Sequence, residues 1–191
     1  MMLLQETESV NYLHAHQWRA LLQNITDPRD RALFLVAHSH GLQAREIASL
    51  EPCDVRWHPP TITLRRRGGP YSREIPLLPE ESRALMAWLR VPRSPTEALF
   101  PSRNHRPISR RRLDFLMKQY CAAAGIPREK AKFRVLRNSC AMELARGGDA
   151  WLLADWVGFR DVRTAYHYMR QPNVRQAQAV RDENDAKRRE K

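Results

Sequence analysis

The stretch KFRVLRNSCAMELA, residues 132–145, predicts a helix that carries an arginine on a mainly apolar face. Gly147 and Gly148 are expected to end this helix. Arg137 is unusual in such a place, because burying an unpaired guanidinium is costly. A pocket that binds an anion explains Arg137 better than the alternative, a structural ion pair with Glu46 or Glu143.

Helices and a small sheet are predicted around this stretch. Asp27 and Pro28 are typical of a helix start, and Gly41 is typical of a helix end. Residues 44–50 indicate a short second helix. Residues 55–77 contain a Pro-Pro break, a β-prone run and a Gly-Gly-Pro turn, which predict a hairpin or a small antiparallel sheet. Further helices are expected at 79–89, from Ser109 to Gly125, and after Asp149, the last with Leu152, Leu153, Trp156 and Val157 buried. The predicted fold class is mixed α/β, mainly helical, with a small antiparallel sheet.

Basic residues dominate the charge of the chain. Its 191 residues include 33 Lys and Arg against 21 Asp and Glu, which gives a net charge of +12. Of the 33 basic residues 28 are Arg, which binds phosphate oxygens with two parallel hydrogen bonds. Nucleic acid is therefore the expected partner. The alternative is a basic protein that is kept soluble by its surface charge.

Several classes of protein are excluded by the sequence. The apolar runs are too short for a membrane span, and the first sixteen residues show no secretory leader. Cys53, Cys121 and Cys140 are odd in number and lack metal-binding spacing, which predicts free thiols in a reducing cytoplasm. The seven histidines are scattered without a cysteine or carboxylate cluster, so no metal site is predicted.

The order of several motifs resembles the catalytic domain of the tyrosine site-specific recombinases, the phage integrase family. The motifs that carry the resemblance are Gly41-Leu42-Gln43-Ala44-Arg45-Glu46-Ile47, the basic hairpin, Val135-Leu136-Arg137-Asn138-Ser139-Cys140, Trp156-Val157-Gly158-Phe159 and Tyr168. The likeness covers residues 27–168 and is nearest to the short fimbrial phase-switch invertases. It implies the fold of a recombinase catalytic domain without the usual N-terminal core-binding domain.

The resemblance implies chemistry on DNA that needs neither a metal nor another cofactor. In this family a tyrosine hydroxyl attacks a phosphodiester, two arginines hold the phosphate, a hairpin lysine acts as general acid, and histidines assist. The positions that match the family's catalytic set are Gln43, Arg67, Arg134, Arg137, Phe159 and Tyr168. Arg65 and Arg66 are alternatives to Arg67, because the length of the turn is uncertain by two residues.

Only Arg137 and Tyr168 keep the residue type of the family, and the other four positions depart from it. Gln43 stands where the family has arginine, and losing one such stabilising donor costs on the order of 10² to 10³ in rate. Arg67 replaces the lysine and is a poorer proton donor at neutral pH. Arg134 and Phe159 each stand in place of a histidine, and phenylalanine cannot form hydrogen bonds.

Arg45 is not expected to take the place of Gln43. Two residues along a helix lie about 200° apart around its axis, so the two side chains point in different directions unless the backbone there is irregular.

Three groups of arginines are expected to contact DNA phosphates. The candidates are Arg65, Arg66 and Arg67 on the hairpin, Arg110, Arg111 and Arg112 at a helix start, and Arg134. The alternatives are a charged sheet edge that prevents strand aggregation and an ordinary solvated helix face. Tyr168 likewise has an alternative role, as an amphipathic residue half-packed against the last helix.

The sequence divides into an N-terminal segment (1–26), a recombinase-like domain (27–170) and a polar C-terminal tail (171–191). The favoured function is a DNA-binding regulator or accessory factor with impaired or absent strand cleavage, located in the bacterial cytoplasm with the nucleoid. The alternatives are an active invertase that uses Tyr168 and an unrelated RNA-binding or structural protein. The tail is expected to mediate a homo-oligomer on DNA, and a partner recombinase is a further candidate partner.

Overall fold

The structure, a computed structural model, describes residues 10–65, 72–92 and 96–178. Within these residues the helices are α1 (Ala15–Gln23), α2 (Pro28–Ser39), α3 (Ala44–Ala48), α4 (Pro79–Leu89), α5 (Arg110–Ala123), α6 (Arg134–Ala145), α7 (Ala150–Val157) and α8 (Val162–Met169). Short 3₁₀ turns lie at Pro52–Asp54 and Arg128–Lys130, and residues 172–178 are again helical.

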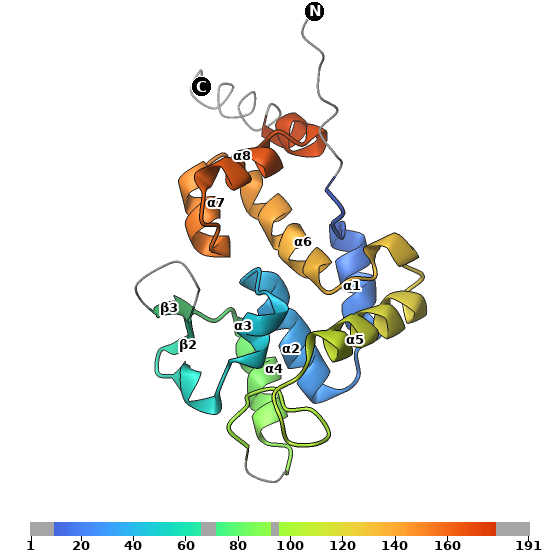
Figure 1. Ribbon diagram of the computed structural model, residues 1–191, viewed down its shortest axis with the longest axis vertical. Coiled ribbons are helices and arrows are strands. Elements are labelled where there is room, and N and C mark those ends of the chain that lie inside the picture. Colours follow the sequence, from blue (N-terminus) through green and yellow to red (C-terminus); the bar gives the residue numbers. More distant parts are fainter. Residues whose placement is uncertain (1–9, 66–71, 93–95, 179–191) are drawn as a thin grey trace, which may run out of the picture.

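One small sheet lies beside these helices (Figure 1). Its strands β1 (Val55–Trp57), β2 (Pro60–Leu64) and β3 (Arg73–Pro76) are antiparallel in the order β1-β2-β3. Ile62 pairs with Val55 on one side and with Ile75 on the other, and all three side chains are buried. The predicted fold class, mainly helical with a small antiparallel sheet, is confirmed.

The helix ends follow local capping chemistry. The Asp27 carboxylate accepts a hydrogen bond from the Asp30 backbone N–H, with Pro28 at the first helical position of α2. The Ser109 hydroxyl caps α5 by accepting from the Arg112 N–H. Asp149 caps α7 in the same way. Because such caps depend on neighbouring residues alone, these starts were predictable from the sequence.

Two clusters of buried apolar side chains hold the fold together. The larger one joins α1, α2, α4, α5 and the sheet, and includes the N-terminal part of α6. The smaller one joins the rest of α6 to α7 and α8, and also contains Tyr12 and Val174. Residues of the N-terminal segment and of the first part of the tail therefore pack into this smaller cluster. The expected burial of Leu152 is wrong: it is 51% exposed, next to the exposed Trp151.

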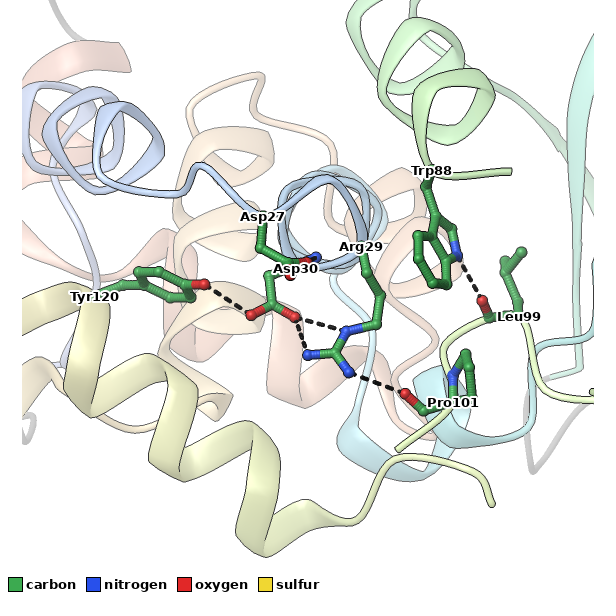
Figure 2. Close-up of polar contacts among 7 residues, drawn as sticks. All are labelled: Asp27, Arg29, Asp30, Trp88, Leu99, Pro101 and Tyr120. Carbon is green, nitrogen blue, oxygen red and sulfur yellow. Dashed lines mark hydrogen bonds and ion pairs between the residues drawn. The ribbon is translucent and has the colours of Figure 1, made fainter. Parts of the chain in front are cut away.

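A buried polar network fixes α5 against α2 (Figure 2). The Asp30 carboxylate is 2% exposed and accepts hydrogen bonds from the Tyr120 hydroxyl at 2.7 Å and from the Arg29 Nε at 2.8 Å. Arg29 also donates to the Pro101 carbonyl at 3.1 Å. A buried carboxylate is stable when it is paired and hydrogen-bonded in this way. The network therefore fixes the C-terminal half of α5, where Tyr120 lies, against the start of α2.

Candidate nucleic-acid interface

Arg137, on α6, is held by three backbone carbonyl groups. Its Nη1 donates to the Gly41 oxygen at 2.6 Å and to the Val157 oxygen at 2.8 Å, and its Nη2 donates to the Gly158 oxygen at 3.3 Å. The side chain is only 12% exposed. One guanidinium thus ties α6 to the turn after α2 and to the end of α7.

Two glycines allow these carbonyls to reach Arg137. Gly41 has φ +59°, and a Cβ at this position would lie 3.2 Å from Val157 Cγ1 and 3.3 Å from Cys140 Sγ. Gly158 has φ +74° and ends α7 in the left-handed conformation that glycine adopts most easily. A side chain at Gly41 would push the turn after α2 away from α6 and α7.

Glu46 provides part of the countercharge for Arg137. One of its carboxylate oxygens lies 3.8 Å from Arg137 Nη1 and accepts a hydrogen bond from the Gln43 backbone N–H at 2.7 Å. Burial lowers the pKa of the Arg137 guanidinium, and Glu46 opposes that shift. Of the two carboxylates considered as partners from the sequence, Glu143 instead lies 3.7 Å from His38.

An aromatic stack joins Arg137 to Tyr168 on α8. The Arg137 guanidinium carbon lies 5.2 Å from the centre of the Phe159 ring, a cation–π distance. The Phe159 ring in turn stacks on Tyr168, with centroids 5.4 Å apart and planes 13° from parallel. The three residues, separated by up to 31 positions in the sequence (137 to 168), therefore form one layer.

The hydroxyl of Tyr168 faces Asn138 rather than solvent. It donates to Asn138 Oδ1 at 3.0 Å, while Asn138 Nδ2 donates to the Asn11 carbonyl at 2.8 Å. Tyr168 is 9% exposed, and burial raises the pKa of its phenol, whereas the charges of Arg137 and Arg134 act in the opposite direction. The phenol is thus protonated at neutral pH, with its hydrogen directed to a neutral amide oxygen.

A cleft of about 670 Å³ opens beside this layer, and we call it the cationic cleft. The cationic and amide side chains that line it are Gln43, Arg45, Arg110, Lys132, Arg134, Arg137 and Asn138. Asp114 is the carboxylate in its lining, and it accepts a hydrogen bond from the Phe133 N–H at 3.0 Å. Arg45, Lys132 and Arg134 are exposed and have no hydrogen-bond or ion-pair partner among the described residues. The cleft therefore has an excess of positive charge that suits an anion.

The structure brings several predicted site residues together. Gln43, Arg110, Arg134 and Arg137 line the cationic cleft, and Phe159 and Tyr168 adjoin it through Arg137 and Asn138. Five of the six positions that matched the family's set thus come from the α3 start, α6, the α7 end and α8, and meet in space.

Other predicted arginines lie elsewhere. Arg65 forms a forked ion pair with the buried Asp54, with distances of 2.7 and 2.8 Å, so its guanidinium is engaged within the fold. Arg112 lies over the Phe115 ring at 4.9 Å and lines a separate hollow beside Asp30 and Tyr120. Arg111 is exposed on α5 and does not line the cleft. Arg66 and Arg67 are outside the described residues.

Three residues of the site were not predicted from the sequence: Arg45, Lys132 and Asn138. Gln43 is the N-cap of α3 and has extended backbone angles, φ −81° and ψ 157°. The helical offset of about 200° therefore does not apply between Gln43 and Arg45, and both line the cleft. Lys132 and Asn138 lie within two residues of Arg134 and Arg137 in the sequence, and this closeness could have indicated that they belong to the site.

The described residues hold no group of three or more His, Cys, Asp or Glu side chains arranged to bind a metal ion. Among the same residues, no helix is both long and apolar enough to cross a membrane.

The sequence pattern of the phage integrase family matches residues 11–174. Two curated relatives are type 1 fimbriae regulatory proteins of Escherichia coli K12. FimE is 29% identical over 167 residues, covering 82% of this chain and 84% of the relative. FimB is 32% identical over 145 residues, covering 73% and 72%. These matches confirm the predicted resemblance.

Solved structures share the fold. The XerA recombinase superposes with a TM-score of 0.80 at 21% identity, covering 91% of this chain and 65% of XerA. The XerH site-specific recombinase bound to its palindromic difH substrate superposes with a TM-score of 0.76 at 20% identity, covering 89% and 52%. This chain therefore spans between half and two thirds of the length of those two recombinases.

Proposed function

This chain belongs to the phage integrase family, and on that basis we propose that it binds double-stranded DNA in the cationic cleft and cleaves it slowly or not at all. The observation that carries the proposal is a group of three exposed cations, Arg45, Lys132 and Arg134, which have no partner among the described residues and line the cleft beside the Arg137–Phe159–Tyr168 layer. Among structures of the same fold, XerH is bound to its palindromic difH substrate and the Tn1549 transposon integrase is in complex with circular intermediate DNA, which supports DNA as the ligand.

Binding follows from the charge of the cleft. A backbone phosphate has the charge and the acceptor oxygens that unpaired guanidinium and ammonium groups require. Each phosphate that the protein neutralises releases condensed counterions, so affinity falls with salt by a logarithmic slope of about −0.9 per contact. Such contacts position the protein on the duplex and do not read its sequence.

Slow cleavage follows from the groups around Tyr168. Gln43 offers a neutral amide where the resemblance calls for a second arginine, and Phe159 offers no hydrogen bond where it calls for histidine. The Tyr168 hydrogen is directed to Asn138 Oδ1, and an amide oxygen is a far weaker base than an imidazole. We therefore assign the chain a role as a regulator or accessory factor, which agrees with the regulatory names of FimE and FimB.

A second candidate function is an active recombinase. It is favoured by the layer in which Phe159 joins Tyr168 to Arg137, and by the charges of Arg137 and Arg134, which act to lower the pKa of the Tyr168 phenol. In that reaction the Tyr168 oxygen attacks phosphorus and loses its proton, while the bond to the 5′-oxygen breaks. The 5′-oxygen leaves and takes up a proton, and a 3′-phosphotyrosyl link remains.

A nicked duplex that traps covalent adducts separates the two functions. We expect the parent protein to bind this duplex in a salt-dependent manner and to form no more denaturant-resistant adduct than the Tyr168→Phe variant. An adduct in the parent that disappears in Tyr168→Phe would establish the active recombinase. Absence of salt-dependent binding to any duplex would refute both functions.

Three further proposals concern the assembly of the protein on DNA and its location in the cell. We propose that the C-terminal tail mediates a homo-oligomer on DNA, that a partner recombinase supplies the groups this chain lacks, and that the protein resides with the bacterial nucleoid. Part of the tail, residues 179–191, is outside the described residues, while Val174 is buried against the chain's own α6–α8 cluster. Deleting residues 179–191 is expected to lower the stoichiometry on DNA measured by analytical ultracentrifugation. An unchanged stoichiometry would refute the role of the tail.

A further inference from the structure

We propose that Arg45 binds the DNA phosphate that Gln43 faces and supplies the positive charge that Gln43 lacks. This inference rests on the proposed function, because it names a further phosphate-binding residue of the same cleft. It assigns a role to a residue that the sequence pattern alone places on a different face of the helix.

The start of α3 directs both side chains into the cleft. Gln43 is the N-cap, and its extended backbone turns the chain before the first helical residue, Ala44. The Glu46 carboxylate accepts the Gln43 N–H at 2.7 Å and thereby fixes this turn. Gln43 and Arg45 both line the cleft as a result.

No acidic group of the described residues neutralises Arg45. Glu46 is 8% exposed and is engaged with the Gln43 N–H and with Arg137. Asp114, the other carboxylate near the cleft, accepts from the Phe133 N–H and lies 3.9 Å from Arg110. Arg45 has no hydrogen-bond or ion-pair partner in the described part of the chain, and its positive charge contributes to lowering the pKa of Arg137. Within the described residues its guanidinium is thus unpaired, and it lines the same cleft as Arg137.

Arg137 has little capacity left for a phosphate. A guanidinium has five N–H donors, and three of those of Arg137 are used by the carbonyls of Gly41, Val157 and Gly158. The remaining two N–H donors can bind one non-bridging oxygen of a phosphate. The other non-bridging oxygen needs a further charged donor, because a phosphate in a partly closed site is best held by more than one cation.

Arg45 is the charged residue on the α3 wall of the cleft. The residues of that wall are Leu42, Gln43, Ala44, Arg45 and Ala48, and Arg45 is the cation among them. Lys132 and Arg134, at and just before the start of α6, also line the cleft. A phosphate in the cleft therefore has Arg45 from α3 available in addition to Arg134 and Arg137 from α6.

The salt dependence of duplex binding tests this role. Arg45→Gln is expected to reduce the steepness of log affinity against log salt by about 0.9, the contribution of one phosphate contact. The matched control is Arg83→Gln, which removes the same charge from an exposed position on α4 that does not line the cleft. Because Arg45 and Arg83 are both exposed, the two variants should unfold at the temperature of the parent.

A charge-relocation variant tests whether the two positions serve one phosphate. Combining Gln43→Arg with Arg45→Gln returns a guanidinium to the same wall, and the parent slope should return with it. The inference is overturned if Arg45→Gln keeps the parent slope, or if the double variant keeps the slope of Arg45→Gln. Failure of the parent itself to bind duplex DNA would instead refute the proposed function, so the two failures are distinguishable.

Discussion

Replacing Arg137 by methionine should destabilise the fold strongly, whether or not DNA is present. Methionine fills much of the same volume but donates no hydrogen bond. The carbonyls of Gly41, Val157 and Gly158 would each lose a partner, and the Glu46 carboxylate would stay buried without its cation. All four of these groups lie where α6 meets the turn after α2 and the end of α7.

The expected loss is about 3–5 kcal/mol. The two short hydrogen bonds, at 2.6 and 2.8 Å, come from a charged donor and contribute about 1.5 kcal/mol or more each. Leaving Glu46 as an unpaired buried charge adds to that loss, and release of the penalty for burying the guanidinium offsets part of it. Arg137→Lys keeps a positive charge near Glu46 but cannot donate from two separate nitrogens, so about 1–3 kcal/mol is expected.

Urea unfolding at pH 7, followed by tryptophan fluorescence, measures these losses. The control is Arg83→Met on the exposed face of α4, which should stay within about 0.5 kcal/mol of the parent. An Arg137→Met variant as stable as that control would show that the three carbonyl contacts do not hold the fold. The prediction also implies that weak DNA binding by Arg137 variants has to be corrected for their unfolded fraction.

Three further predictions concern stability. Burial lowers the pKa of His38 in the folded protein to about 4. As the pH falls below 6.5, the unfolded chain therefore binds a proton at this position before the folded protein does. The free energy of unfolding should decrease between pH 6.5 and pH 4 by up to about 1.4 kcal/mol per pH unit. His38→Phe, which keeps the stack on Trp18, should flatten this part of the curve in urea unfolding, and equal slopes would contradict the assignment. Gly41→Ala should lower the free energy of unfolding by about 2–4 kcal/mol, because Gly41 has a positive φ and a Cβ there would be crowded. Gly125 has a similar φ but open space around it, so Gly125→Ala should cost only about 1–2 kcal/mol. Thermal unfolding of both variants measures the difference. Tyr120→Phe should cost about 1.5–3 kcal/mol, because the buried Asp30 carboxylate loses a donor, and a neutral result in chemical denaturation would show that Arg29 suffices.

The elements predicted correctly are those that local chemistry determines. The starts of α2, α5 and α7 follow from Asp27, Ser109 and Asp149, each of which caps backbone N–H groups two or three residues ahead. Helix α4 has the predicted bounds, 79–89, because Pro79 suits a first helical position. Arg137 lines the cationic cleft, but its guanidinium is also held by three carbonyls and lies 3.8 Å from Glu46, so the choice of an anion pocket over an ion pair with Glu46 stays a prediction.

The features that the sequence did not reveal depend on contacts between distant segments. Arg65 pairs with Asp54 across the sheet, and no local pattern distinguishes it from an arginine that is free to bind phosphate. Leu152 has the spacing of a core residue, yet the packing of α6 and α8 on α7 leaves it exposed. Arg45 and Gln43 both line the cleft because the backbone of Gln43 is not helical. Helical periodicity assumes a regular helix and therefore cannot predict this arrangement.

The central claim, that one DNA phosphate lies in the cationic cleft, is tested most directly by a crystal structure of the protein with a duplex selected for tight binding from a random pool. We expect a backbone phosphate within hydrogen-bonding distance of Arg45, Arg134 and the two remaining donors of Arg137. A duplex bound on another face of the protein, with the cleft left open to solvent, would contradict the claim.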